Sequence, residues 1–561
     1  MQKKSYPDSL VPKYTFSEEN QELLLKEDPI IKRMKKARND KSKDLFRPHF
    51  HFVNPENTLN DPNGLCFWNG AWHLFYQVRP PEDQRLHWGH AVSSDLVHWR
   101  DLPYALYPGP ENGCYSGTVL IENERAIAIY HGTEIGNMVA IAKDPLLLNW
   151  EKIEANPVIP FGNESEPPKP YGIFDPCIWE KNETYYALSA GIEENNFIGK
   201  HKATTYLFRS KDLVHWEYLH QFIDNEKFTL EGDDIACPYF LPIGEKYILL
   251  FFSHMTGGQY FLGEYDKIND KFIPHKHGLF NFGATFPGGV HAPSATNDED
   301  GNVIVVLNMN PAKPTYKPDN YLKSFLDVEE DKKRFTESAT NTQYDWDQLI
   351  TLPRKLSLKN ESEIFIEPVE TIKSLRKHHS RLENINLEAN KEFYLDHISG
   401  NTIELVLNIV PKPSALFEIF VLQSPNKEEF TKISFYYKRG LIYRAPFEND
   451  FRANRIMSTA LSRPVNHESI VTIDTSNSSV LPDVVARPPE IAPVAVDGNR
   501  IEFQIFIDRS IIEVFINKTQ CLAVRVYPGL NESVGCSMRS RNQDSHLISL
   551  DAWKMKNIYK E

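Results

Sequence analysis

The stretch LCFWNGAWHLFY, residues 65–76, carries the clearest fold signal in this chain of 561 residues. Its two apolar and aromatic runs are separated by Asn69-Gly70, and an Asn-Gly pair in that position is typical of a tight turn between antiparallel strands. Comparable units recur as IWEKNETYYAL at residues 178–188 and as YFLPIGEKYILL at residues 239–250. The sequence therefore predicts a domain built of β-hairpins.

A second motif repeats along the same region. SSDLVHW at residues 93–99 returns as RSKDLVHW at residues 209–216, and KDPLLLNW at residues 143–150 is a looser copy. Each copy follows an expected strand and precedes a turn. Four-stranded units repeated in this way are typical of propeller blades, and about 310 residues would form five blades of about 60 residues each.

The predicted fold class is all-β, with a five-bladed β-propeller followed by a C-terminal antiparallel β-sandwich. We place the propeller at residues 45–358 and the sandwich at residues 379–561, where alternating strands return. Residues 359–378 are expected to be a linker that contains a short helix in ETIKSLR, residues 370–376.

Residues 1–44 are predicted to form an N-terminal helical extension. Ser17 can cap a helix that continues through three leucines at positions 23–25. The basic run KRMKKAR at residues 32–38 is interpreted as a solvated surface segment, with binding to an anionic partner as the alternative.

The composition argues against several kinds of site and partner. A formal net charge of −14 repels phosphate backbones, so no nucleic acid is expected as a partner. The six cysteines lie far apart and lack a CxxC pair, which favours scattered buried thiols over a zinc site or a disulfide scaffold. No run of about 18 apolar residues predicts a membrane span, and no apolar run near the N-terminus predicts a secretory signal, so a cytoplasmic location is expected. No feature of the sequence predicts an oligomeric state.

The most prominent candidate site residue is Asp61, in NDPNG at residues 60–64. On its own this pentapeptide fits a turn as well as a catalytic site, because proline and glycine are common turn residues. Gln77 and Trp88 follow soon after. Because a hairpin returns the chain between them, these polar and aromatic groups are expected to converge at one end of a blade.

Several short motifs occur in one order along the chain. They are NDPNG at residues 60–64, FYQ at 75–77, WGH at 88–90, SDLVHW at 94–99 and YSGT at 115–118. Together they resemble glycoside hydrolase family 32, the invertases, inulinases and levanases, and FIDRSIIEVF at residues 506–515 resembles that family's sandwich domain. The resemblance covers about residues 46–555 and implies a five-bladed propeller joined to a sandwich.

The resemblance also implies a retaining glycosidase, without cofactor or metal, that cleaves β-D-fructofuranosyl linkages in sucrose-like sugars or fructans. Asp61 would attack the anomeric carbon and form a fructosyl-enzyme intermediate, while a second carboxyl about 5–5.5 Å away protonates the leaving oxygen. The implied partner is a fructosyl-containing oligo- or polysaccharide. The residues implied to line the fructosyl subsite are Asn60, Gln77, Trp88, Tyr115 and Ser116.

IFDP at residues 173–176 departs from the family pattern Arg-Asp-Pro. By resemblance, Asp175 hydrogen-bonds sugar hydroxyls and steadies the transition state. Phe174 stands where the family has arginine, and it supplies neither the forked donors nor the charge of that residue. Either another residue does that work or the sugar is oriented differently, and Phe174 is kept as a candidate for substrate binding.

The proton donor is the most divergent position. The family's acid lies in Glu-Cys-Pro, whereas the corresponding residues 236–238 are ACP. Alternate strand residues share a face and lie about 6.6 Å apart, so Asp234 is the favoured acid/base, brought to the site by a slight shift or a bulge. Glu231 and Asp233 are the alternate acids.

Two alternative functions stay open. If no acid replaces the missing glutamate, the chain is a catalytically silent fructan-binding protein on the same fold. If another sugar accepts the fructosyl group in place of water, it is a fructosyltransferase.

Two further departures concern the pocket. His291 stands in HAP where the family has Tyr-Ala-Pro, and it is either a pocket residue or a structural one. LNMN at residues 307–310 replaces a segment rich in Trp and Gly, which predicts different binding of the substrate's second unit.

Overall fold

The structure is a computed structural model that describes residues 11–57, 59–83, 85–161, 169–195, 200–224, 234–283, 285, 287–312, 346–411, 416–440, 468–485, 487–496, 498 and 500–559. The chain forms two compact units. Unit 1 comprises Met1–Leu375, Asp483–Val485 and Lys556–Glu561, and unit 2 comprises Arg376–Pro482 and Ala486–Met555. Within the described residues, no helix is long and apolar enough to cross a membrane.

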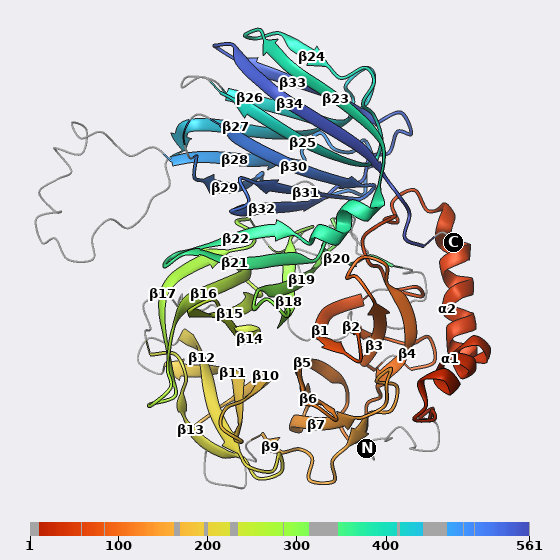
Figure 1. The fold of residues 1–561 in the computed structure, drawn as a ribbon, viewed down its shortest axis with the longest axis vertical. Coiled ribbons are helices and arrows are strands. Elements are labelled where there is room, and N and C mark those ends of the chain that lie inside the picture. Colours follow the sequence, from red (N-terminus) through yellow and green to blue (C-terminus); the bar gives the residue numbers. More distant parts are fainter. Residues whose placement is uncertain are drawn as a thin grey trace, which may run out of the picture. The chain divides into compact units, whose positions relative to one another are not determined.

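The described part of unit 1 contains five antiparallel sheets, and each sheet is one blade of a β-propeller (Figure 1). Blade one consists of β1 (Leu59–Trp68), β2 (Ala71–Val78), β3 (His87–Ser93) and β4 (Arg100–Leu106). Blade two consists of β5 (Cys114–Ile121), β6 (Ala126–Gly132), β7 (Gly136–Ala142), β8 (Glu151–Lys152) and β9 (Ile159–Pro160). Blade three consists of β10 (Ile173–Glu180), β11 (Tyr185–Asn195), β12 (Lys200–Ser210) and β13 (Glu217–Gln221). Blade four consists of β14 (Ala236–Ile243), β15 (Lys246–Ser253), β16 (Gly257–Asp266) and β17 (Lys271–Leu279). Blade five consists of β18 (Val290–Asn297), β19 (Val303–Met309), β20 (Leu349–Ile350), β21 (Arg354–Asn360) and β22 (Glu363–Pro368).

The five sheets close into a ring through their first strands. β1 contacts both β5 and β18, β10 contacts β5 and β14, and β14 contacts β18. The first strand of each blade therefore lines the centre of the ring (Figure 1). Strands in the middle of a blade, such as β3 and β6, are buried along their whole length because neighbouring blades pack on their faces. The predicted propeller is confirmed.

Both repeated sequence signals form turns at the predicted places. Asn69 and Gly70 have φ angles of 48° and 80° in the turn between β1 and β2, values that favour these two residue types. In SSDLVHW the carboxylate of Asp95 accepts hydrogen bonds from two following backbone N–H groups, at 3.0 and 2.8 Å. Asp212 does the same in the second copy. One local device therefore turns the chain between the third and fourth strands of blades one and three.

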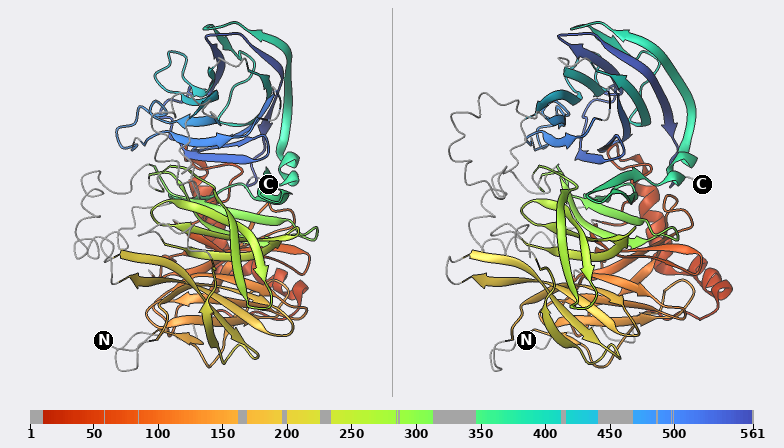
Figure 2. Two further views of the ribbon diagram at one scale, coloured as in Figure 1. Left: turned by 90° about the vertical axis from the view of Figure 1, so that its left-hand side faces the viewer. Right: turned by 60° about the vertical axis from the view of Figure 1, so that its left-hand side comes forward.

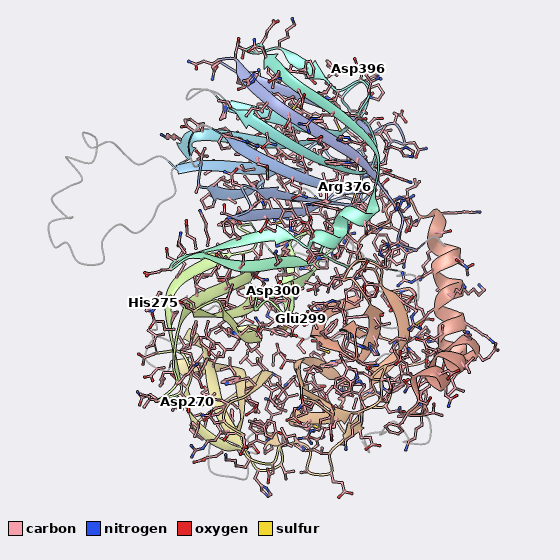
Figure 3. The ribbon with its side chains drawn as sticks, in the orientation of Figure 1. Asp270, His275, Glu299, Asp300, Arg376 and Asp396 are labelled. Carbon is pink, nitrogen blue, oxygen red and sulfur yellow. The ribbon has the colours of Figure 1, made fainter. Side chains whose placement is uncertain are left out.

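Neighbouring blades are also joined by charged groups. Asp270, in the turn between β16 and β17 of blade four, pairs with Lys181 of blade three. Tyr186 and Tyr265 donate hydrogen bonds to the same carboxylate at 3.1 and 2.6 Å. Figure 3 shows Asp270 on the side of the propeller where these two blades meet.

Two helices precede the propeller, as predicted. α1 (Glu18–Glu27) and α2 (Pro29–Asp40) are followed by the 3-10 helix η2 (Lys41–Lys43). Ser17 precedes α1 in an extended conformation, although its hydroxyl makes no capping hydrogen bond. The helices lie along blade one (Figure 1), where Leu25 packs in an apolar cluster with Val92 and Leu102.

The basic run of α2 is solvated only in part, which corrects the expectation of a solvated segment. Lys36 is exposed, but the guanidinium of Arg38 forms an ion pair with Asp101 at 2.5 Å and lies over the ring of Tyr559. When a helix packs on a sheet, the charged residues on its inner face contact the sheet, while those on its outer face stay in solvent. Arg38 is on the inner face and holds α2 to blade one.

The described part of unit 2 consists of two six-stranded antiparallel sheets that form a β-sandwich (Figure 2). One sheet has the order β23 (Arg376–Leu387), β34 (Ser545–Met555), β25 (Thr402–Val410), β30 (Ile501–Asp508), β31 (Ile511–Ile516) and β32 (Gln520–Arg525). The other has the order β24 (Glu392–Tyr394), β33 (Gly535–Arg541), β26 (Leu416–Gln423), β27 (Thr431–Gly440), β28 (Glu468–Asp474) and β29 (Glu490–Val494). Apolar residues of both sheets, such as Leu405 and Val471, are fully buried, as expected of two facing sheets.

The propeller ends further along the chain than predicted, and the sandwich begins slightly earlier. β22 pairs with β21 across a tight hairpin, so the first part of the predicted linker, residues 359–378, belongs to blade five. The short helix predicted in ETIKSLR is present as the 3-10 helix η4 (Glu370–Leu375), and the sandwich begins at Arg376. The prediction missed β22 because a short edge strand of mixed polarity resembles a linker until its pairing partner is known.

All six cysteines are buried free thiols, as predicted.

Candidate active site

The first strand of every blade is interrupted by a β-bulge near its start. At each bulge two residues of the first strand lie opposite one residue of the second, so the strand bends and redirects its side chains. The bulged pairs are Asn60-Asp61, Tyr115-Ser116, Phe174-Asp175, Cys237-Pro238 and His291-Ala292. Because these five strands line the centre of the ring, the bulges bring most of the predicted site residues to one place.

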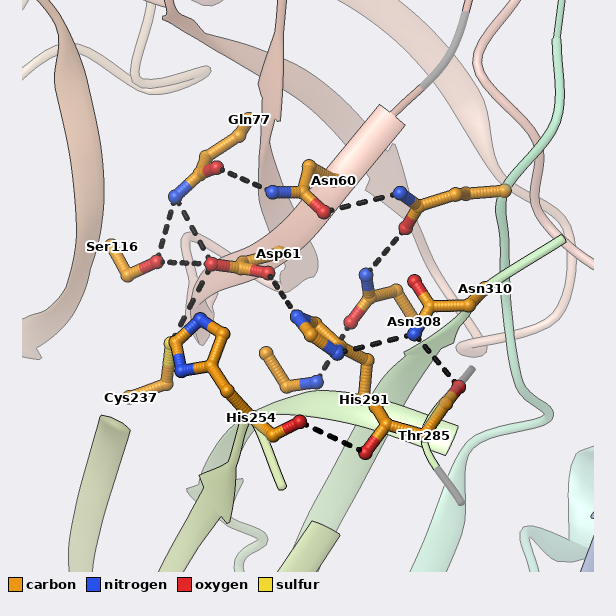
Figure 4. A network of polar contacts seen from close by, with 12 residues as sticks. Asn60, Asp61, Gln77, Ser116, Cys237, His254, Thr285, His291, Asn308 and Asn310 are labelled. Carbon is orange, nitrogen blue, oxygen red and sulfur yellow. Dashed lines mark hydrogen bonds and ion pairs between the residues drawn. The ribbon is translucent and has the colours of Figure 1, made fainter. Parts of the chain in front are cut away.

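Asp61 lies within β1, so NDPNG is a bulged strand and not a separate turn. Its side chain is 11% exposed. The Ser116 hydroxyl and the Gln77 amide donate hydrogen bonds to Oδ2 at 2.7 and 3.2 Å (Figure 4). Among the described residues, no group donates a hydrogen bond to the buried Oδ1. One oxygen of Asp61 is thus held in place, while the other is buried without a hydrogen-bond donor among the described residues.

A chain of side-chain amides orients Gln77. Asn60 donates to Oε1 of Gln77 at 3.0 Å, Gln348 donates to Oδ1 of Asn60 at 3.2 Å, and Asn308 donates to Oε1 of Gln348 at 2.6 Å. The structure therefore places Asn60 and Gln77 beside Asp61, as expected. Gln348 was missed by sequence reasoning, and the LNMN departure was the only signal that pointed to Asn308.

Asp175 and Asp61 are linked through Cys237, which sequence reasoning also missed. The backbone N–H of Cys237 donates to Oδ2 of Asp175 at 3.0 Å. Its Sγ lies 3.5 Å from that oxygen and 3.7 Å from Oδ2 of Asp61. A positive φ of 49° at Cys237 allows this backbone group to turn toward the carboxylate.

Burial raises the pKa of the Asp175 carboxyl to about 6, and the negative charge of Asp61 adds to this effect. Burial and the same two carboxylates raise the pKa of the Cys237 thiol well above its ordinary value. The thiol therefore keeps its proton at neutral pH and acts as a weak donor between the two acids.

His291 is buried and its ring faces the Asp61 carboxylate. Its Nδ1 accepts a hydrogen bond from the Asn310 amide at 3.3 Å, so the ring proton lies on Nε2, 3.7 Å from Oδ1 of Asp61 (Figure 4). Burial lowers the pKa of His291 to about 4, although the charge of Asp61 opposes this. The ring is therefore neutral at pH 7 and presents an N–H toward Oδ1 of Asp61.

The two main departures from the family pattern meet in one apolar cluster. Ala236 is 1% exposed and packs with Cys237, Phe252 and Ala292, and Phe174 lies against the same cluster. Neither position can donate a proton or carry charge. Phe174 thus replaces the arginine of the family pattern and Ala236 replaces its glutamate, and both apolar side chains contact the same cluster.

Asp234 does not share a strand face with Ala236, because β14 begins only at Ala236. Its Oδ1 accepts the backbone N–H of His254 at 2.8 Å, and its Oδ2 lies 2.6 Å from Nδ1 of the same histidine. The carboxylate is therefore occupied as an acceptor on both oxygens. The alternate acids Glu231 and Asp233 lie outside the described residues.

Trp88 differs from its expected role. Its side chain is fully buried, packs on Phe75 and Tyr130, and donates from Nε1 to the backbone carbonyl of Tyr115 at 2.8 Å. It supports the bulge that carries Tyr115 and Ser116 and does not line the site. Among the described residues, no three His, Cys, Asp or Glu side chains are grouped as a metal site.

Two family models match the chain, "Glycosyl hydrolases family 32 N-terminal domain" over residues 51–368 and "Glycosyl hydrolases family 32 C terminal" over residues 371–554. A levanase of Bacillus subtilis (strain 168) is 23% identical over 557 residues, which cover 92% of this chain and 71% of the levanase. An insoluble β-fructofuranosidase isoenzyme of Arabidopsis thaliana is 26% identical over 566 residues, which cover 91% of this chain and 96% of that protein.

The fold is shared with solved structures. Fructan 1-exohydrolase IIa from Cichorium intybus has a TM-score of 0.71 and 21% identity, over 92% of this chain and 98% of that one. Because the two family models match most of the chain, it belongs to glycosyl hydrolase family 32, a family of glycosidases.

Proposed function

We propose that the chain hydrolyses β-D-fructofuranosyl linkages in sucrose-like sugars or fructans, with retention of configuration and with Asp61 as the nucleophile. The observation that carries this proposal is the state of the Asp61 carboxylate. Ser116 and Gln77 hold Oδ2, while Oδ1 is buried and accepts no hydrogen bond from the described residues. A carboxylate held in this way meets the demand of nucleophilic catalysis for one oriented, poorly solvated oxygen.

The relatives support this substrate class. Two proteins that match over most of the chain are named levanase and β-fructofuranosidase, and a structural neighbour is named fructan 1-exohydrolase. Their names share a fructosyl unit and differ in what is attached to it. The fructosyl side of the bond is therefore the part of the substrate that these names support for this chain.

The first step follows from the geometry of Asp61. Oδ1 attacks the anomeric carbon of the fructofuranosyl unit, the bond to the leaving oxygen breaks, and that oxygen takes a proton. The product is a fructosyl ester of Asp61. In the second step water attacks the same carbon, the ester bond breaks, and Asp61 is released with overall retention.

Asp175 is proposed to stabilise the sugar as positive charge develops on its ring. The bulge places it across Cys237 from Asp61, with the Cys237 Sγ 3.5 Å from Oδ2 of Asp175 and 3.7 Å from Oδ2 of Asp61. Above about pH 6 it is ionised and can accept hydrogen bonds from sugar hydroxyls. A carboxylate so placed favours the cationic transition state over the neutral substrate.

The test is hydrolysis by the full chain and by an Asp61→Asn variant. The wild-type chain should release fructose from at least one of sucrose, inulin and levan, and the variant should lose roughly a thousandfold or more of kcat while it stays folded, with a Tm no lower than that of the wild type. Asp300→Asn is the matched control (Figure 3). Asp300 is exposed and follows the C-terminal end of β18, whereas His291 lies near the N-terminal end of that strand.

The outcomes separate the alternatives. Binding of fructan without release of fructose from any substrate would favour a silent binding protein. Longer saccharides formed in excess over free fructose would favour a fructosyltransferase. Full activity in Asp61→Asn would overturn the assignment of the nucleophile.

A further inference from the structure

The site described above holds a nucleophile but no acid at the expected position. The leaving alkoxide of a sugar is a poor leaving group until it is protonated. Ala236, which replaces the family's glutamate, is 1% exposed in an apolar cluster and has no proton to give. A donor must therefore come from another residue that reaches the same side of the pocket.

His254 and Asp234 form a pair beside this gap. Phe252 lies opposite Ala236 in the ladder between β14 and β15, and His254 lies two residues beyond Phe252. The ring of His254 lies 5.8 Å from the ring of His291, whose Nε2 faces Asp61 (Figure 4). The His254 side chain is 66% exposed, so a substrate can reach it, which is not true of position 236.

The pair has a defined orientation. Asp234 accepts the backbone N–H of His254 with one oxygen at 2.8 Å and faces Nδ1 with the other at 2.6 Å. The carboxylate therefore holds the Nδ1 proton, and Nε2 is the ring nitrogen left for a ligand. Asp234 itself uses both oxygens as acceptors, which suits a residue that positions the histidine better than one that donates a proton.

Similar pairs elsewhere in the chain test whether this geometry is only structural. His98 and His215 contact Asp95 and Asp212 through Nδ1 at 2.7 and 2.8 Å, but each of these pairs lies within one turn, three positions apart in sequence. His254 is 20 residues from Asp234 in sequence. Long-range pairing and a place beside the carboxylates of the site distinguish it from the two turn histidines.

The charges around His254 favour its protonated form. Partial burial lowers its pKa, but the hydrogen bond to Asp234 and the charges of Asp234, Asp61 and Asp175 outweigh burial and raise it above the ordinary value. These acids come from the segment before β14, from β1 and from β10. Among the described residues, His291 of β18 also faces the ring, and it is neutral at pH 7.

We infer that His254, positioned by Asp234, is the general acid and base of the reaction proposed above, in place of the missing glutamate. This inference rests on that proposed function. As Asp61 bonds to the anomeric carbon, the leaving oxygen takes the Nε2 proton of the imidazolium and its bond to the carbon breaks. In the second step the neutral Nε2 takes a proton from the attacking water, which restores the imidazolium and frees Asp61.

The kinetic test compares His254→Gln with His98→Gln in the full chain. The two substrates are the saccharide that the wild type cleaves best and 4-nitrophenyl β-D-fructofuranoside, whose leaving group needs little protonation. His254→Gln should lower kcat/KM for the saccharide by about a hundred- to ten-thousandfold and have a much smaller effect on the nitrophenyl substrate. It should also abolish the alkaline limb of the pH profile, while His98→Gln should match the wild type.

Asp234→Asn tests the positioning role. It should shift the alkaline limb to lower pH, because His254 then loses the partner that favours its charged form. A direct reading is the NMR titration of His254, assigned by its absence in His254→Gln. The pKa should be raised in the wild type and should fall in Asp234→Asn, whether or not the protein turns over substrate.

Each contrary result has a distinct meaning. If the wild type cleaves neither substrate, the proposed function fails and this inference fails with it. If the wild type is active but His254→Gln equals it on the saccharide, or loses both substrates equally, only the role of His254 is overturned. The same holds if Glu231→Gln or Asp233→Asn alone produces the dependence on the leaving group, or if Asp234→Asn leaves the pKa of His254 unchanged.

Discussion

Replacing Asp175 with asparagine should make the propeller more stable at neutral pH while it lowers activity. Asp175 is 8% exposed, and the pKa of its carboxyl rises from an ordinary 3.8 to about 6, first because of burial and then because of Asp61. The folded state therefore holds this proton more tightly than the unfolded state. Stability from this group is complete below about pH 4 and is lost as the pH rises through about 6.

The size of the effect follows from the same numbers. A rise from 3.8 to about 6 corresponds to ~3 kcal/mol, because one pKa unit is about 1.4 kcal/mol. The hydrogen bond from the Cys237 N–H lowers this pKa, so its charge assistance is already contained in the net shift, and asparagine keeps an oxygen that can accept that N–H. The Asp175→Asn chain should therefore gain ~3 kcal/mol relative to the wild type at about pH 8 and little at about pH 3.

The assay is calorimetric unfolding of the full chain across this pH range, with Asp300→Asn as a control that should show no such dependence. The Tm of the propeller transition should rise by a few degrees in Asp175→Asn above pH 7. In the Asp61→Asn background the gain should be smaller, because the second cause of the raised pKa is gone. A stability difference that does not change with pH, or a variant less stable than wild type at pH 8, would refute the reasoning.

Two further predictions concern packing. Ala236→Glu should cost ~1–3 kcal/mol in stability, because the new carboxyl enters an apolar cluster without a partner. In a double-mutant cycle, adding Phe174→Arg should recover part of that loss. Strictly additive effects of the two substitutions would contradict this prediction. Arg38→Met should lower the free energy of unfolding by ~2–4 kcal/mol, because it breaks the buried ion pair with Asp101. Lys36→Met, at an exposed position, should change that free energy by no more than ~0.5 kcal/mol. The two effects are compared through Tm, and equal effects would show that α2 is not held by the Arg38 pair.

Much of the fold was predictable because its signals are local. The Asn69-Gly70 hairpin and the Asp95 turn are each encoded within a few residues, and both form where the sequence places them. β22 was missed because its identity as a strand depends on pairing with β21 and not on its own composition.

The site was predictable only where a motif carried its residues. Asp61, Gln77 and Asp175 lie in short motifs, and the structure brings them together. Cys237 was not anticipated, because its link to Asp175 spans 62 residues and its contact with Asp61 spans 176. Gln348 contacts Asn60 across 288 residues.

The sequence by itself determined the all-β class, the repeat of hairpins and the identity of the two carboxylates, since side-chain alternation and turn chemistry act over a few residues. Only the tertiary structure decided which groups face Asp61 and which residue stands near the place of the absent glutamate. The reason is that closing five sheets into a ring aligns five bulges from strands far apart in the chain, and no local pattern records which side chains then meet. His254 beside Asp234 is the clearest case, because neither residue carries a signal of the other until β15 is laid against β14.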